Sequence, residues 1–152
     1  MADIVDPVTR SVMMSRIRGK NTKPELTLRS LLRRQGFRFR LHCRELPGRP
    51  DIVFPRHKAV VFVHGCFWHG HACRYFRWPA SRPEFWRTKI GRNQFNDAAA
   101  LDALQQMGWR VAVVWECAMR GKSVQDVNDL GVAVGAWLTS DAVSLVLPVE
   151  LP

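Results

Sequence analysis

Two short β-rich runs, separated by only four residues, constrain the fold of this chain more than any other feature. Residues 51–54 read Asp-Ile-Val-Phe, residues 59–63 read Ala-Val-Val-Phe-Val, and the Pro-Arg-His-Lys segment between them joins the two as a hairpin. Residues 110–115 are a further apolar run typical of a buried strand, and in residues 37–41 phenylalanine or leucine alternates with arginine, which is strand periodicity. Together these runs predict a β-sheet.

Helical segments lie between and around these strands. Residues 22–35 and 81–107 each begin with a Ser/Thr-x-x-Glu capping-box pattern that has proline near the helix start. We expect the second of these helices to break near Gly91 and then resume, and residues 123–138 to form a last helix before an apolar tail. The order α-β-β-β-α-β-α predicts one α/β domain over residues 1–152, with a mixed sheet flanked by helices.

The net charge of +10 is spread unevenly along the chain. Residues 1–92 carry 20 basic and 6 acidic side chains, whereas residues 93–152 carry 3 and 7. A basic balance of this size favours a polyanionic partner, and arginine, which outnumbers lysine here, suits phosphate and base contacts. A generic solubilising surface is the alternative. We expect nucleic acid as the partner, with residues 1–20 as a basic segment that contacts DNA.

Membrane and export signals do not fit this sequence. Its longest strongly apolar run, residues 59–63, is far too short to cross a bilayer. The first residues read Met-Ala-Asp-Ile-Val-Asp and lack the basic-then-apolar order of a signal peptide. We therefore expect a cytoplasmic protein without membrane contact, associated with the nucleoid through its DNA partner.

Two of the four cysteines lie close to His71 in the sequence. Cys66, His71 and Cys73 provide three soft or borderline metal ligands within eight residues, and Cys117, just past the strand at residues 110–115, can complete a tetrahedral site. Four ligands and no open position indicate a structural zinc site, with ordinary buried thiols as the alternative. Cys43 has no histidine at a useful spacing and stands apart.

The segment around Asp51 suits phosphodiester chemistry. A carboxylate at the start of a strand can hold a hard divalent cation, and the neighbouring strand ends at His64, with His69 close behind. Hydrolysis of a phosphodiester needs an activated water, charge neutralisation and a proton for the leaving oxygen, which a metal-bound carboxylate and two imidazoles can supply. Asp97 can orient one imidazole. The alternatives are a turn aspartate after proline at Asp51 and an exposed acid in the first turn of a helix at Asp97.

Aromatic side chains alternate with arginines between residues 67 and 87. Such a mixture suits stacking or wedging between bases, with the arginines on phosphates, while a local hydrophobic cluster over the zinc site is the alternative. We assign Phe67, Trp68 and Trp86 to DNA and leave Phe76 and Phe85 open between DNA and core.

Several of these segments are motifs of one known family. The matching segments are Leu-Pro-Gly-Arg-Pro-Asp at 46–51, His-Gly-Cys-Phe-Trp-His at 64–69, and residues 84–86, 89–91, 108–111 and 114–117, with residues 9–11, Met14 and Glu25 in agreement. In these positions the sequence resembles the very-short-patch repair DNA mismatch endonuclease family. The resemblance covers roughly residues 1–120. It departs in the His-Gly-His-Ala-Cys segment, where the family often has a longer histidine run.

The resemblance implies a restriction-endonuclease-like fold and a magnesium-dependent nick on the 5′ side of the T in a T:G mismatch, the product of 5-methylcytosine deamination. The implied partner is double-stranded DNA with that mismatch. Proteins of a mismatch-repair and cytosine-methyltransferase system are possible further partners. Because a nickase needs one active site, we expect a monomer. A less specific restriction-type nuclease and a zinc-stabilised DNA-binding module without catalysis remain alternatives.

The resemblance also implies roles for individual residues. Asp51 is implied as a magnesium ligand, which Val63 can join only through its carbonyl, and His69 as the proton-transfer residue. His64, Asp97 and Glu25 are implied as supporting residues, although the capping box explains Glu25 without catalysis. The implied zinc ligands are Cys66, His71, Cys73 and Cys117. The implied intercalating residues are Phe67, Trp68 and Trp86, with Met14 and Ile17 on the opposite groove.

Overall fold

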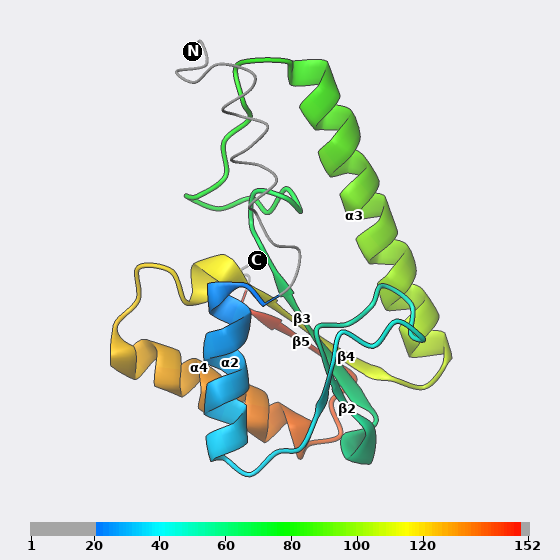
Figure 1. Ribbon diagram of the computed structural model, residues 1–152, viewed down its shortest axis with the longest axis vertical. Helices are drawn as coiled ribbons and strands as arrows, with labels where there is room; N and C mark the ends of the chain where they lie inside the picture. The colour runs from blue at the N-terminus through cyan, green and yellow to red at the C-terminus, as the bar shows by residue number, and fades with distance from the viewer. Residues whose placement is uncertain (1–20, 150–152) are drawn as a thin grey trace.

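A five-stranded mixed sheet lies at the centre of the protein, whose computed structural model describes residues 21–149 (Figure 1). The strands lie in chain order across the sheet and are β1 (Arg40–Leu41), β2 (Ile52–Phe54), β3 (Ala59–His64), β4 (Arg110–Trp115) and β5 (Ser144–Leu147). The pairs β1–β2 and β2–β3 are antiparallel, and the pairs β3–β4 and β4–β5 are parallel. The predicted mixed sheet and its hairpin are confirmed, although β1 is shorter than the alternation in residues 37–41 predicts.

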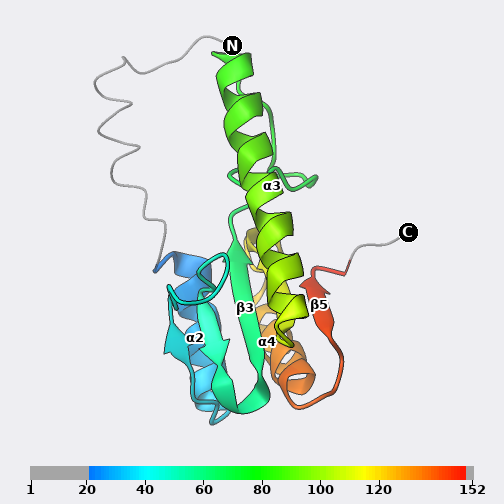
Figure 2. The same cartoon turned by 90° about the vertical axis from the view of Figure 1, so that its right-hand side faces the viewer.

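Three α-helices within residues 21–149 cover this sheet: α2 (Lys23–Arg34), α3 (Pro83–Gln106) and α4 (Val124–Leu138). Helices α2 and α4 pack against each other over one face, and α3 lies along the other, as Figures 1 and 2 show from two sides. Because helices cover both faces, the central strands are apolar almost throughout rather than alternating. In this part of the chain we find no helix with the length and hydropathy that a bilayer crossing requires.

Alternation along the strands sends side chains into two separate cores. Ile52 and Phe54 of β2 join the core beneath α2 and α4, whereas Val53 between them joins the core beneath α3. The same alternation turns His64 and Trp115, the last residues of β3 and β4, toward the side of α3. The carboxyl ends of the two central parallel strands therefore present polar and aromatic groups to one side of the sheet.

Helix α3 is continuous over 24 residues, so the predicted break near Gly91 is wrong. Gly91 is exposed and nothing lies within 4 Å of the place where a Cβ would be, so it adds only the general cost of a helical glycine, about 1 kcal/mol. Buried Trp86, Ile90 and Leu104 anchor the helix on both sides of that position. In Figures 1 and 2 the N-terminal half of α3 and residues 65–82 extend together beyond the sheet.

The two predicted capping boxes are also wrong. Thr22 is the N-cap residue of α2 and Arg82 that of α3, and neither side chain makes a capping hydrogen bond. Arg82 is in the left-handed region, with φ of 53°, which turns the chain sharply into the helix. By contrast, the Oγ of Ser123 accepts a hydrogen bond from the N–H of Asp126 at 3.1 Å, as expected at the start of α4.

The apolar tail that follows α4 contains a strand that the sequence analysis did not predict. Strand β5 pairs with β4, with Val146 opposite Val113 and Leu147 opposite Val114. It is four residues long and only partly buried, so its periodicity is too weak to distinguish it from an irregular tail. Pairing with the edge of β4 determines its conformation.

Candidate active site

Asp51 lies directly before β2, and its side chain is held by the neighbouring strand. Its Oδ2 accepts a hydrogen bond from the backbone N–H of Val63 in β3 at 2.7 Å. Burial, together with the nearby Glu25 carboxylate, raises the pKa of Asp51 from 3.8 to about 7. A carboxylate that keeps its proton so strongly is one that a bound cation would stabilise in the charged form.

Glu25 of α2 and His42, the residue after β1, lie beside Asp51. Ligand atoms of these three residues lie within 4.8 Å of one another. The Oε2 of Glu25 accepts hydrogen bonds from Arg29 and from the Nε2 of His42, the latter at 2.8 Å. The Glu25 carboxylate therefore lies beside Asp51 rather than against the amide groups of its own helix, which explains why the capping box does not form. We call Glu25 and Asp51 together the acid centre.

His42 is the residue that sequence reasoning missed. It follows an alternating strand and carries no motif, so nothing local distinguished it from an exposed histidine. Only the pairing of β1 with β2 reveals its place: Leu41 pairs with Ile52, so the residue after β1 lies opposite Asp51.

His64 and His69 stack face to face beside this acid pair. Their ring centroids are 3.9 Å apart and the planes differ by 6°. The Nδ1 of His69 lies 2.5 Å from the Oδ2 of Asp97 in α3, so the carboxylate orients that ring. Burial and the neighbouring His69 lower the pKa of His64 from 6.5 to about 3, so His64 is a neutral imidazole at physiological pH.

One cavity is lined by Asp51 and by the His64, His69 and Asp97 group, whereas Glu25 and His42 lie outside its lining. Its volume is about 750 Å³, and Val63 of β3 is also among its lining residues. Asp51, directly before β2, and the His69–Asp97 pair from the loop and α3 therefore open into the same space. Such a space places a carboxylate for a cation and an oriented imidazole for a proton beside one substrate group.

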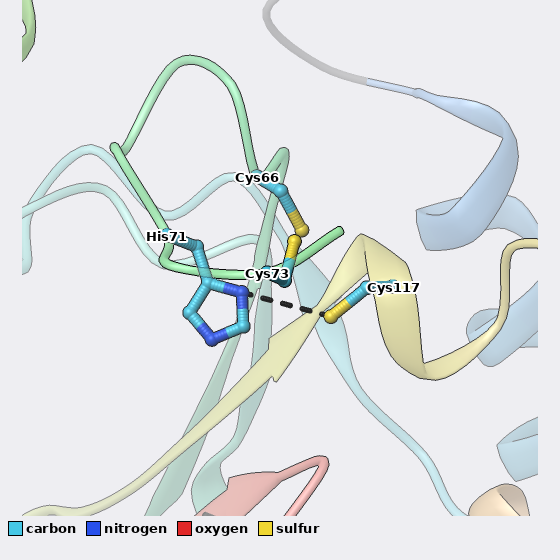
Figure 3. Close-up of side chains that lie close together, drawn as sticks. All are labelled: Cys66, His71, Cys73 and Cys117. Atoms are coloured by element: carbon cyan, nitrogen blue, oxygen red, sulfur yellow. Dashed lines mark hydrogen bonds between the residues drawn. The ribbon is translucent and has the colours of Figure 1, made fainter. Parts of the chain in front are cut away.

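A second cluster, Cys66, His71, Cys73 and Cys117, lies at the end of the parallel strands (Figure 3). One ligand atom from each lies within 4.8 Å of the others, and the Nδ1 of His71 is 3.6 Å from the Sγ of Cys117. All three cysteines are free thiols, and burial raises the pKa of Cys66 and of Cys117. Three thiols and one imidazole that converge in this way fit a tetrahedral zinc ion.

The zinc-type cluster and the histidine pair share a neighbour, Trp115 at the end of β4. The ring of His71 stacks on Trp115 at 4.1 Å, with planes 8° apart, and His64 meets the same indole edge-on at 5.1 Å. Cys43 lies outside both groups, with its Sγ 3.0 Å from Glu45. The structure therefore brings together the four residues that the spacing grouped and leaves out the one that the spacing excluded.

An aromatic cluster fills the space between residues 65–82 and the start of α3. Phe67 contacts both Trp68 and Trp86, with centroids 5.2 Å apart in each pair, and Trp68 and Trp86 are 5.8 Å apart. Trp86 is only 7% exposed, whereas Phe85 beside it is 41% exposed and lies under the guanidinium of Arg82. Of the two residues that the sequence left open, Phe85 is on the surface and Phe76 is half-buried against Phe67.

The chain is similar in sequence to known proteins. The family model described as DNA mismatch endonuclease Vsr matches residues 2–75. The DNA mismatch endonuclease Vsr of Escherichia coli is 44% identical over 144 residues, which are 95% of this chain and 92% of that protein. The Type II nicking enzyme V.XorIIP of Xanthomonas oryzae pv. oryzae is 52% identical over 131 residues, covering 86% and 90%. The chain belongs to the Vsr family of DNA mismatch endonucleases.

A further relative of this Vsr-family chain is the Type II nicking enzyme V.NmeAIP of Neisseria meningitidis serogroup A, 43% identical over 124 residues, which are 82% of this chain and 89% of that protein. Family membership confirms the resemblance that the motifs carry. It does not test the roles of single residues. Met14 and Ile17, with the rest of residues 1–20, lie outside the described residues, and the roles given to the remaining site residues stay predictions.

Proposed function

We propose that this Vsr-family chain is a magnesium-dependent endonuclease that nicks one strand on the 5′ side of the T in a T:G mismatch left by 5-methylcytosine deamination. The nick would begin very-short-patch repair. The single observation that carries the proposal is the shared cavity, which is lined both by the buried Asp51 and by a histidine that the Asp97 carboxylate orients. A DNA-binding module without catalysis has no need of this arrangement.

Asp51 would hold the divalent cation, with the carbonyl of Val63 as a second ligand and Glu25 completing the acid centre. Magnesium bound there supplies charge neutralisation on the phosphate and a more acidic water. His69 moves a proton at its Nε2, because its Nδ1 is engaged by Asp97. His64 remains neutral, and its stacked ring keeps the plane of His69 fixed.

Zinc at Cys66, His71, Cys73 and Cys117 would be structural. All four protein ligands are present, so no position is open for a water or a substrate. The ion would tie the loop that carries His69 to the short helical turn after β4 (Glu116–Ala118). The same loop carries Phe67 and Trp68, the proposed mismatch contacts, so zinc would fix their positions relative to His69, the proposed proton-transfer residue.

Phe67, Trp68 and Trp86 are the proposed wedge beside the mismatched pair, with Met14 and Ile17 on the opposite groove. A T:G pair stacks less well than a matched pair, so inserting aromatic rings there costs less. Trp86 is buried behind Phe67 and Trp68, so it would reach DNA only when those rings separate. We also propose that the mixed sheet is a restriction-endonuclease-like fold, that the enzyme acts as a monomer, and that mismatch-repair and methyltransferase proteins are its partners.

The test is a nicking assay on end-labelled duplexes that carry T:G, T:A or C:G at one position, in several flanking contexts, with and without magnesium. We expect a nick 5′ of the mismatched T, in that strand only, and only with magnesium. Cleavage of a matched duplex as fast as the T:G duplex would indicate a less specific restriction-type nuclease. Mismatch binding without any nicking would indicate the non-catalytic module.

A further inference from the structure

Two donors converge on one oxygen of the buried Glu25. The side chain of Glu25 is 2% exposed, and its Oε2 accepts hydrogen bonds from both Arg29 and His42. The Nη2 of Arg29 contacts Glu25, the Oδ1 of Asn21 and, at 3.4 Å, the Nε2 of His42, and its Nε has no partner among the described residues. Arg29 therefore supplies the charge beside Glu25, and the ring of His42 provides the second contact to the same oxygen.

His42 contacts both acids of the centre. Its backbone N–H donates to the carbonyl of Asp51 at 3.1 Å, and its Nε2 lies 2.8 Å from the Oε2 of Glu25. The first contact attaches His42 to the strand that carries Asp51, and the second attaches it to the helix that carries Glu25. No other described residue makes a hydrogen bond to both of these acids.

The backbone of His42 agrees with a positioning role. Its φ is 48°, in the left-handed region that side chains other than glycine rarely adopt. This conformation turns the chain at the end of β1, beside α2. The imidazole is partly exposed, at 22%, so its own burial does not explain why the turn is kept.

We propose that His42 is a positioning residue of the cation site, and the inference rests on the proposed function. Its Nε2–H holds the Glu25 carboxylate at Oε2, and ligand atoms of Glu25 and Asp51 lie within 4.8 Å of each other. The two carboxylates then present ligands to a divalent cation in one geometry, without rearrangement on binding. Groups that orient metal ligands in this way contribute about ten- to a hundredfold to metal affinity.

The test uses zinc-loaded, DNA-free protein and Mn²⁺ as the probe, with bound Mn²⁺ measured by electron paramagnetic resonance. His42→Asn keeps a residue that tolerates the left-handed backbone but is too short to reach Glu25. His42→Gln places an amide N–H close to the position of Nε2. His57→Asn is the matched control, since His57 lies at the far end of the β2–β3 hairpin and packs on Phe37. Melting temperature and zinc content are recorded for each variant.

We expect His42→Asn to weaken Mn²⁺ binding, and to raise the magnesium concentration for half-maximal nicking, by about tenfold or more, with zinc content unchanged. His42→Gln should restore most of this loss, and His57→Asn should match the wild type. Equal Mn²⁺ affinity in wild type and His42→Asn, or no recovery in His42→Gln, would overturn the inference. A wild type that binds Mn²⁺ but does not nick T:G duplexes contradicts the proposed function instead, and the Mn²⁺ comparison still decides the role of His42.

Discussion

Replacing Asp51 by asparagine should abolish nicking and at the same time stabilise the metal-free protein at neutral pH. The Asp51 carboxyl has a pKa of about 7 in the folded state, against 3.8 in the unfolded chain, because burial and the Glu25 carboxylate oppose its charge. The folded state therefore binds this proton more tightly. The group's contribution to stability is complete below about pH 4 and is lost as the pH rises through about 7.

Asparagine removes this penalty without removing the local hydrogen bond. Its amide oxygen can accept from the backbone N–H of Val63, as Oδ2 of Asp51 does. The shift in pKa corresponds to about 4 kcal/mol at pH 8, at about 1.4 kcal/mol for each pKa unit. Water in the adjoining cavity screens part of it, so we expect about 2 kcal/mol, or roughly 4–8 °C in melting temperature.

The assay compares melting curves of zinc-loaded wild type and Asp51→Asn at pH 5 and pH 8, each with and without magnesium. Without magnesium, the variant should melt higher at pH 8, and the difference should narrow at pH 5. Magnesium should raise the melting temperature of the wild type at pH 8 and leave the variant unchanged, because the cation replaces the proton only where a carboxylate is present. A variant that melts no higher than the wild type at pH 8 would refute the reasoning about burial, and equal responses to magnesium would refute the ligand assignment.

Three further predictions address the other parts of the site. Asp97→Asn should slow nicking by about 10²- to 10⁴-fold with little change in T:G binding, because Asp97 orients Nδ1 of His69; a single-turnover assay measures the rate, and a near-normal rate would remove Asp97 from the chemistry. Cys117→Ser should lower both the zinc content and the melting temperature, whereas omitting magnesium should stop nicking without lowering the melting temperature. Zinc analysis together with thermal melts distinguishes these two effects. A normal zinc content in the variant would contradict the proposed zinc ligands. Trp68→Ala should weaken binding to a T:G duplex by about tenfold or more while binding to a matched duplex changes little, as gel-shift titrations measure; an equal loss on both duplexes would mean that Trp68 is not a mismatch wedge.

Much of the fold follows from patterns that neighbouring residues set. The hairpin formed by β2 and β3, the buried strand β4 and the helices α2 and α4 all carry periodicity strong enough to be recognised locally. The exceptions are instructive. Gly91 does not break α3, because the packing of Trp86, Ile90 and Leu104 outweighs the propensity of one glycine. Strand β5 forms because β4 offers it an edge, which no local pattern in the tail reveals.

The candidate site divides in the same way. Cys66, His71 and Cys73 are close in sequence, and their residue types and spacing are enough to indicate a metal site. Asp51 and His64 were recognised by their places at the ends of strands, and His69 by its position shortly after His64. The pairing of Glu25 with His42 was not, because a capping-box pattern offered a simpler explanation for Glu25 and His42 carried no motif. Aromatic residues among arginines indicated DNA contact but did not indicate that Trp86 is buried.

The sequence by itself therefore determined the strand and helix types, the basic half of the chain and the grouping of Cys66, His71 and Cys73, since each depends on residues that are neighbours in the chain. Only the tertiary structure decided which distant groups meet. Glu25 on α2 and His42 after β1 both lie beside Asp51, and Asp97 on α3 lies beside His69. Burial then moves the pKa of Asp51 to about 7 and that of His64 to about 3. These pKa values depend on burial and on charges that are close in space but distant in the sequence, so no local sequence pattern predicts them.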